Sequence, residues 1–280
     1  MFDCLSQGET YMDTETRIPR SDLWEISSGR FAVRKWPTVS IVIPAKNEAQ
    51  NLPHVLPRIP VWADEVILVD GNSTDATIEV ARQLLPQIRV VHQKGRGKGD
   101  ALRAGFKTAR GEIIVMLDAD GSTDPAEIPL FVAMLRAGAD FAKGSRFAQG
   151  GSTTDMPLYR KVGDWFFVLL VRILFGGGYS DLCYGYNAFW ARLLPHLGLD
   201  GDGFEIETMM NIRALFGGFR IAEVPSIESR RIHGVSHLRT FPDGWRVLTT
   251  ILKERFVRGW KGQTSRKPVV RSSRVISHSD

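Results

Sequence analysis

Two aspartates separated by one residue, Asp118 and Asp120, have the types and spacing in this chain that point most directly to chemistry. They follow the largely apolar run 112–117, which predicts a buried strand, and open α/β sheets bind ligands at the carboxyl ends of their strands. Neighbouring carboxylates offer the hard oxygen ligands that Mg²⁺ or Mn²⁺ takes when it bridges a diphosphate. The pair therefore predicts a metal-dependent nucleotide site. The structural alternative is a turn, because residues 121–125 are typical turn and cap formers.

Two further loops carry carboxylates directly after predicted strands. The loop 44–48 ends in Glu48, and the loop 70–75 begins with Asp70 and ends with Asp75. Loops at the carboxyl ends of parallel strands can face one crevice, so we expect Glu48 and Asp70 to contact a nucleobase or ribose there. Asp75 stands where a helix N-cap belongs, and capping is its expected role.

The glycine-rich segment 95–99 contains Arg96 and Lys98. It does not follow the first strand and lacks the full glycine spacing of a dinucleotide-binding fingerprint. Its basic residues favour direct contact with phosphate, and Lys98 could reach a donor diphosphate. A plain flexible loop is the alternative.

Strands that alternate with helices must position these loops. This order predicts right-handed β-α-β units and an α/β fold with a Rossmann-like, mostly parallel sheet flanked by helices. The predicted strands are 39–43, 66–69, 88–91 and 112–117. A short or irregular helix is predicted from about residue 48, and regular helices are predicted at 75–85 and 99–109.

The 280 residues, 43% of them hydrophobic and 24% charged, suffice for one large α/β domain. We expect a loosely ordered polar leader at 1–37, the main domain at 38–240, and an amphipathic helix with a basic, partly disordered tail at 241–280. Cys4 and Cys183 lie in unlike contexts, so a disulfide framework is not expected and a reducing cytoplasm fits. No export signal or membrane span is expected, because Arg172 interrupts the longest apolar run, 165–175.

The positive charge of the chain is concentrated in its tail. Residues 253–280 hold eight basic residues against two acidic ones, a net of +6, which leaves −1 for residues 1–252 of the total of +5. Just before the tail, Trp245, Leu248, Leu252 and Phe256 recur at helical spacing. A basic amphipathic helix beside the aromatic stretch 165–175 indicates peripheral contact with an anionic membrane surface at the cytoplasmic face. The tail alone would also suit nucleic acid or a solvated segment.

Taken in order, the motifs of this chain resemble those of the family 2 glycosyltransferases, and among these most of all the dolichol-phosphate (polyprenol-phosphate) mannosyltransferases and their glucosyl relatives. The resemblance covers roughly residues 38–240. It implies a GT-A fold, a nucleotide-sugar donor of the GDP-mannose or UDP-glucose type, a divalent metal, inversion at the anomeric carbon and a polyprenol-phosphate acceptor, with no nucleic acid partner. The motifs that carry it are 44–48 (PAKNE), 69–75 (VDGNSTD), 97–105 (GKGDALRAG), 118–120 (DAD) and 144–146 (GSR).

On the donor side the resemblance assigns base and ribose contacts to Pro44, Lys46, Glu48, Val69 and Asp70, and metal and diphosphate contacts to Asp118, Ala119 and Asp120 with Lys98. Ser122 stands where the family often has a glutamine at the metal. Lys46 stands where the synthases commonly have a tyrosine, so the identity of the base stays open.

On the acceptor side the resemblance assigns the lipid phosphate to Arg146, Arg160, Arg231 and Ser236. Guanidinium groups suit this role because they bind phosphate through paired hydrogen bonds. Asp164 stands where a serine is expected four residues after Arg160, and His237 stands where a lysine usually follows the serine.

The implied chemistry is a single displacement at the anomeric carbon, with Asp120 holding the metal at the leaving group. A phosphate acceptor is already ionised and needs no base, whereas a hydroxyl acceptor needs one. The candidates for that base are Asp181, Glu205 and Glu207, with helix capping or the positioning of arginines as their alternative roles. Transfer to a soluble hydroxyl acceptor and a non-catalytic basic membrane-binding module remain the competing functions. A nucleotidyltransferase is less consistent with the sequence, because it would be expected to carry a glycine-rich loop after its first strand, where this chain has 44–48 (PAKNE).

Overall fold

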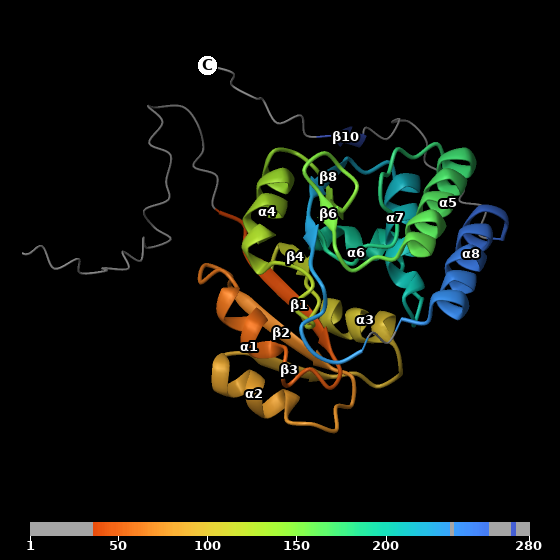
Figure 1. The fold of residues 1–280 in the computed structure, drawn as a ribbon. Helices are drawn as coiled ribbons and strands as arrows, with labels where there is room; N and C mark the ends of the chain where they lie inside the picture. The colour runs from red at the N-terminus through yellow and green to blue at the C-terminus, as the bar shows by residue number, and fades with distance from the viewer. Residues whose placement is uncertain (1–35, 236–237, 258–269, 273–280) are drawn as a thin grey trace, which may run out of the picture. The chain divides into compact units, whose positions relative to one another are not determined.

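A mostly parallel sheet forms the centre of the computed structural model, which describes residues 36–235, 238–257 and 270–272 (Figure 1). Its strands lie in the order β10-β8-β5-β7-β4-β1-β2-β3, and only β7 runs antiparallel to its neighbours. The strands are β1 (Val39–Ala45), β2 (Glu65–Asp70), β3 (Arg89–His92), β4 (Ile113–Met116), β5 (Phe141–Ser145), β7 (Asn187–Trp190), β8 (Ile221–Pro225) and β10 (Val270–Ser272). The predicted α/β class and mostly parallel sheet are confirmed.

Helices connect these strands close to the predicted positions. The first connection is irregular, as expected from its prolines: α1 (Leu52–Val55) is followed by a 3₁₀ turn, η2 (Leu56–Arg58). Next come α2 (Thr77–Leu84) and α3 (Lys98–Thr108). The chain then forms η3 (Pro125–Glu127), α4 (Ile128–Arg136), α5 (Leu158–Phe175), η4 (Ala191–Leu193), α6 (Leu194–Leu197), α7 (Glu205–Phe216) and α8 (Thr240–Phe256). A separate pair of short strands, β6 (Ser152–Thr153) and β9 (Ile227–Glu228), runs parallel.

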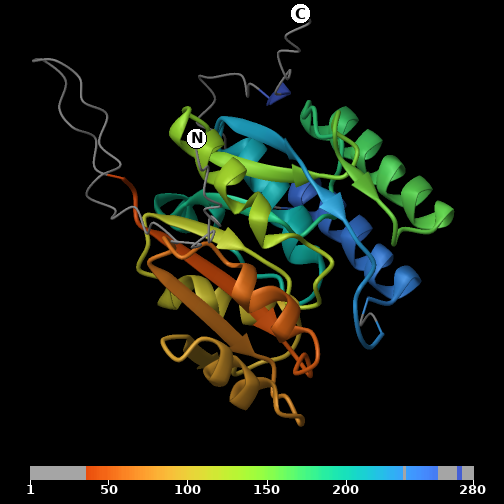
Figure 2. The ribbon, with the colours of Figure 1, turned by 60° about the vertical axis from the view of Figure 1, so that its left-hand side comes forward.

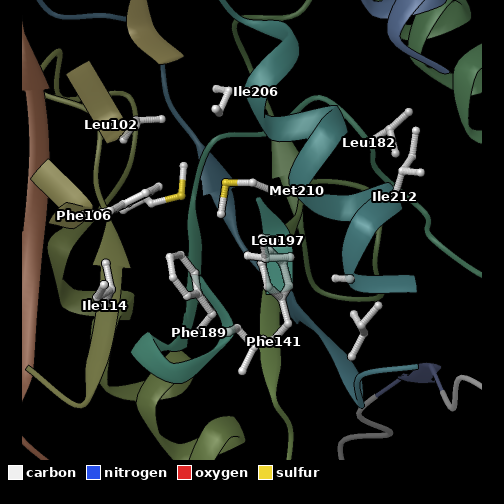
Figure 3. Close-up of a cluster of buried hydrophobic side chains, with 14 of the residues drawn as sticks. Leu102, Phe106, Ile114, Phe141, Leu182, Phe189, Leu197, Ile206, Met210 and Ile212 are labelled. Atoms are coloured by element: carbon white, nitrogen blue, oxygen red, sulfur yellow. The ribbon is translucent and has the colours of Figure 1, made fainter. Parts of the chain in front are cut away.

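The main hydrophobic core lies between the sheet and the layer that contains α3 and α7 (Figure 3). Phe189 of β7 is at its centre, with Phe106 of α3 edge-on at 5.3 Å and Phe141 of β5 stacked at 5.8 Å. Gly105 allows α3 to lie close to the sheet, because a Cβ at this position would overlap Val42 of β1. Helix α4 packs against β4, β5, β7 and β8.

Helices α5, α7 and α8 pack together, and each contributes side chains to this core. Figure 2 shows α8 alongside α5 from a second direction. Helix α5 begins at Leu158, seven residues before the apolar stretch singled out in the sequence. None of the helices in the described residues is both long and apolar enough to span a bilayer.

The chain order places a topological switch beside β1. Strands β2 and β3 extend the sheet on one side of β1. The chain then returns, and β4 pairs with the other edge of β1. The loops after β1, β2 and β4 therefore leave the same end of the sheet, where a ligand crevice is expected. Most of the predicted leader (1–35) and most of the basic tail after residue 257 lie outside the described residues.

Candidate functional site

A cleft of about 630 Å³ opens at the carboxyl ends of β1, β2 and β4, and we call it the strand-end cleft. Three predicted loops supply much of its wall, because parallel strands deliver their carboxyl ends to one edge of the sheet. The predicted site residues that line it are Pro44, Lys46, Glu48, Lys98, Asp118, Ala119, Asp120 and Arg231; Gly71, Asn72, Gln93, Arg96 and Phe204 join them.

Arg231 connects the loop after β1 to the paired aspartates. Its guanidinium pairs with Glu48 and lies 3.2 Å from Asp120 Oδ2. Glu48 also accepts a hydrogen bond from Asn51 Nδ2 at 2.6 Å. Burial raises the pKa of Glu48, and the hydrogen bonds from Asn51 and Arg231 oppose that rise. Arg231 thus borders the cleft with its charge shared by two carboxylates.

Lys98 holds the other aspartate. Its Nζ lies 2.6 Å from Asp118 Oδ1 and 2.7 Å from Glu207 Oε1. Burial opposes the positive charge, but the two carboxylates outweigh it and raise the pKa of Lys98. The side chain is therefore a fixed cation at the floor of the cleft, beside the position expected for a diphosphate.

Gly185 leaves room for this ion cluster, a role that no local sequence pattern predicts. A Cβ at this position would lie 2.6 Å from Glu207 Oε1, 2.7 Å from Lys98 Nζ and 3.1 Å from Asp118 Oδ2. These separations are shorter than ordinary van der Waals contact. Only glycine lets the three charged groups converge here.

Two glycines of the glycine-rich segment, Gly97 and Gly99, are required because the backbone packs closely against another part of the chain. A Cβ on Gly97 or Gly99 would overlap the backbone of residues 201–202, and Gly99 N donates to the Asp202 carbonyl at 2.8 Å. Gly97 also has a φ of +92°, which favours glycine. The segment is thus fixed against the start of α7, with Lys98 directed at Asp118.

The paired aspartates fit a divalent cation that completes its shell with phosphate and water. Ser122 donates from Oγ and N to Asp120 Oδ1, at 2.6 and 3.0 Å, so it orients that carboxylate. Among the described residues there is no group of three or more His, Cys, Asp or Glu side chains that could hold a metal. Two carboxylates plus substrate oxygens are the usual set for Mg²⁺, and Asp118 and Asp120 meet that requirement.

Val69 and Asp70 do not line the strand-end cleft. Val69 is buried within β2, and Asp70 accepts hydrogen bonds from Asn72 N and Ser73 N, both at 3.2 Å. Asp70 thereby shapes the loop whose Gly71 and Asn72 line the cleft. Direct base or ribose contact by Val69 and Asp70 stays a prediction. The N-cap of α2 is Ala76, one residue later than predicted, and Asp75 instead accepts a hydrogen bond from Thr77 N at 3.0 Å just before the helix.

A second cavity of about 580 Å³ lies between α5 and α8, and we call it the helix pocket. It shares Lys98, Asp118, Asp120, Phe204 and Arg231 with the strand-end cleft, so the two cavities meet at the paired aspartates. Much of its remaining wall is apolar and aromatic, from Tyr159, Phe166, Phe167, Phe241, Trp245 and Leu248. Such a wall suits a ligand with a long hydrocarbon part.

The arginines of the helix pocket are in different states. Arg146 is nearly buried and binds Asp181 through Nε and Nη2, at 2.7 and 3.0 Å, and Glu228 through Nη1 at 3.1 Å. Arg160 donates from Nε to Thr240 Oγ1 at 3.0 Å and has no ion pair with the described residues. Arg160 is therefore better placed than Arg146 to bind an anion. The predicted Ser236 lies outside the described residues.

The three candidate bases occupy unlike positions. Asp181 is 0% exposed and lines neither cavity; despite its burial, Arg146 and Lys143 hold the pKa of Asp181 below its usual value. Glu205 accepts from Asp202 N and Gly203 N, at 3.0 and 2.9 Å, at the start of α7. Glu207 lines the helix pocket beside Lys98. The geometry of Asp181 matches its alternative role of arginine positioning, whereas Glu205 orders the loop before α7 and does not cap the helix.

The relatives of this chain include mannosyltransferases that act on lipid phosphates by name. The chain is 33% identical over 219 residues to the polyprenol monophosphomannose synthase of Mycolicibacterium smegmatis, which covers 74% of this chain and 83% of that protein. It is 35% identical over 201 residues to the undecaprenyl-phosphate mannosyltransferase of Micrococcus luteus, covering 67% and 82%.

The fold is also shared with a solved structure. A crystal structure of glucosyl-3-phosphoglycerate synthase from Mycobacterium tuberculosis, in complex with Mn²⁺, UDP and glucosyl-3-phosphoglycerate, matches with a TM-score of 0.63. The two chains are 24% identical over 78% of this chain and 80% of the other, a likeness that shows the GT-A-like fold. The family model "Glycosyl transferase family 2" matches residues 40–196, more than half of the chain. The chain belongs to this family and is a glycosyltransferase.

Proposed function

We propose that this protein moves a hexose from a nucleotide sugar to a polyprenyl phosphate, with inversion at the anomeric carbon. The observation that carries the proposal is the junction of two unlike cavities at Asp118 and Asp120. A polar cavity suits a sugar nucleotide, an aromatic one suits a lipid, and transfer requires the two substrates to meet. The names of the relatives agree with transfer of a hexose to a polyprenyl phosphate.

The strand-end cleft holds the donor. Lys46, Glu48 and the loop at Gly71 and Asn72 border its outer part, where the base and ribose lie, and Lys98 borders the diphosphate. Asp118 and Asp120 would hold Mg²⁺ or Mn²⁺, and Ser122 orients the Asp120 carboxylate for that role. When bound, that ion supplies positive charge to the departing diphosphate.

The helix pocket holds the acceptor. Arg160 receives the phosphate, Arg231 borders its path to the donor, and the aromatic side chains of α5 and α8 pack along the isoprenoid chain. A phosphate monoester is already ionised at neutral pH, so its oxygen attacks without a general base. A soluble hydroxyl acceptor is the competing substrate. It would need a base, and Glu207 is the one of the three sequence candidates that lines the pocket.

The outer faces of α5 and α8 lie on the cytoplasmic surface of an anionic membrane. Large apolar side chains are exposed on both helices, among them Trp165 (64% exposed), Phe241 (86%) and Phe256 (68%). Basic residues accompany them, including Arg172 and Lys253. Aromatic residues next to basic ones are typical of proteins that bind the membrane interface, and this position gives the helix pocket access to a lipid.

The test is turnover of the purified protein with a panel of sugar nucleotides and Mg²⁺ or Mn²⁺, with and without a polyprenyl phosphate. Release of nucleoside diphosphate that requires the lipid, and that is lost in Asp120→Ala, supports the proposal and identifies the donor. Turnover only with soluble acceptors would contradict the lipid acceptor. Glu207→Gln would then test the base.

A further inference from the structure

Asp164 is a buried carboxylate in the wall of the helix pocket. It lies four residues after Arg160 in α5, so the two side chains share one face of the helix. Asp164 is 3% exposed, and both residues line the pocket. Arg160, to which the proposed function assigns the phosphate, and Asp164 therefore line the same cavity.

The two oxygens of Asp164 differ. Oδ1 accepts hydrogen bonds from Leu182 N at 3.3 Å and Cys183 N at 3.1 Å. Oδ2 is buried and accepts no hydrogen bond in the part of the chain that the structure describes. The nearby Arg146 is committed to Asp181 and Glu228, so it makes no ion pair with Asp164. One oxygen of this pocket-lining carboxylate is thus buried without a hydrogen-bond partner among the described residues, and we read it as a place for a donor from a ligand or for a proton.

The surroundings favour the neutral acid. Burial raises the pKa of Asp164 to about 6 and the charge of Asp181 adds to the rise, whereas Arg146 and a hydrogen bond from the side chain of Cys183 oppose it. A bound phosphate would raise this pKa further, because like charges oppose ionisation. The charged or titratable groups around Asp164 are Arg160 on its own helix, Lys143 on β5, Arg146 after β5, Asp181 and Cys183 after α5, and Asp243 on α8.

We propose that Asp164 binds the acceptor as a neutral carboxylic acid, whose Oδ2–H donates a hydrogen bond to an oxygen of the lipid phosphate monoester. The inference rests on the proposed function and makes Asp164 a binding residue for the acceptor. No bond between heavy atoms changes: when the acceptor binds to the ionised side chain, Oδ2 takes up one proton from hydronium or buffer acid, and an O–H bond forms there. Arg160 supplies the opposite charge on the same helix face.

A proton dependence of acceptor binding follows. Above pH 7 free Asp164 is mostly ionised, and the phosphate monoester, with a second pKa of about 6, is already a dianion. Binding must then take up a proton, so the acceptor KM rises as pH rises, by up to about tenfold per pH unit. Below pH 6 Asp164 is already protonated and this dependence disappears.

The experiment compares the full-length wild type with Asp164→Asn and Asp164→Ser between pH 6.5 and 8.5, with a short-chain polyprenyl phosphate as acceptor. In the wild type we expect the acceptor KM to rise with pH, whereas both neutral variants keep a flat KM that is about tenfold lower at pH 8. We expect kcat to change little. Thermal unfolding checks that the variants fold.

Calorimetry on the wild type gives a second readout that does not depend on the variants. At pH 7.5, in two buffers of different ionisation heat, binding of the lipid phosphate should take up close to one proton per site. Lipid-dependent turnover with a pH-independent KM and no proton uptake would overturn this inference and leave the proposed function intact. Loss of kcat in Asp164→Asn at an unchanged KM would also overturn it, since that result assigns a base. Turnover with soluble acceptors alone would overturn the proposed function, and this inference with it.

Discussion

The strand-end cleft and the helix pocket meet at the same two aspartates but are built in different ways. Short loops directly after β1, β2 and β4 supply much of the wall of the cleft. The wall of the pocket comes from segments far apart in the chain, between Arg146 and Leu248, that α5 and α8 bring together. In a parallel sheet local sequence decides what lies at a strand end, whereas a pocket between helices depends on packing that no short motif records.

The cationic side chains of the two cavities also differ in how they are paired with carboxylates. At the junction, Lys98 and Arg231 each join two carboxylates that come from different elements of the fold. Deep in the pocket, Arg146 is held by Asp181 and Glu228, while Arg160 keeps donors for a ligand. An arginine in a cavity wall is thus a ligand-binding group only when its partners leave donors free.

Removal of a junction carboxylate should cause the largest loss of activity. In Asp120→Ala, Arg231 and Ser122 lose their shared partner and one carboxylate of the metal site disappears. We expect kcat to fall at least about 10²–10³-fold, the size found when a group that stabilises transition-state charge is deleted. Steady-state release of nucleoside diphosphate measures this effect, with thermal unfolding as the control. Activity within about tenfold of the wild type would remove Asp120 from the site.

Gly185→Ala should be the next most damaging change, although it adds one methyl group. The new Cβ would press on Lys98, Glu207 and Asp118, and a displacement of about 1 Å can cost about 100-fold in rate. The matched control is Gly163→Ala, since Gly163 lines the pocket but a Cβ there meets nothing within 4 Å. Equal kcat values for the two variants would show that the ion cluster tolerates displacement.

The two pocket arginines should respond to truncation in opposite ways. Arg160→Ala removes a hydrogen bond to a charged group, of about 1.5–3 kcal/mol, and should raise the acceptor KM about tenfold or more without loss of stability. Arg146→Ala leaves Asp181 buried without its partner and should lower the free energy of unfolding by about 3–5 kcal/mol.

Chemical denaturation and acceptor titration separate these two effects. The assignment of a structural role to Arg146 would be contradicted if Arg146→Ala were as stable as the wild type. The assignment of the phosphate to Arg160 would be contradicted if Arg160→Ala left the acceptor KM unchanged.

The smallest effect concerns the membrane. Trp165 is exposed on α5 and lines neither cavity, so Trp165→Ala should weaken binding to anionic vesicles several-fold and leave turnover in detergent unchanged. Leu130, 54% exposed on α4, is the control position. Vesicle sedimentation measures the difference, and equal weakening by Trp165→Ala and Leu130→Ala would contradict a membrane contact at α5.

The sequence predicts the cleft better than the pocket for a physical reason. Asp118 and Glu48 could be placed because each follows an apolar run that had to be a buried strand. The same logic brought Asp70 to the right edge of the sheet, but it could not show that backbone N–H groups of its own loop take up that carboxylate.

In the pocket the decisive contacts join distant residues. The partners of Arg146 are 35 and 82 residues away in the chain, so no local pattern reveals that its guanidinium is already occupied. The role of Gly185 cannot be predicted from the sequence either, because it depends on three charged groups from α3, α7 and the loop after β4.

The most direct test of the account is identification of the product by mass spectrometry and NMR after incubation of the protein, the metal and the active sugar nucleotide with a polyprenyl phosphate. If the two cavities deliver their substrates to one junction, the lipid will gain one hexose, linked through its phosphate and inverted at the anomeric carbon. An unchanged lipid, with the hexose transferred to water or to a soluble hydroxyl, would contradict the account.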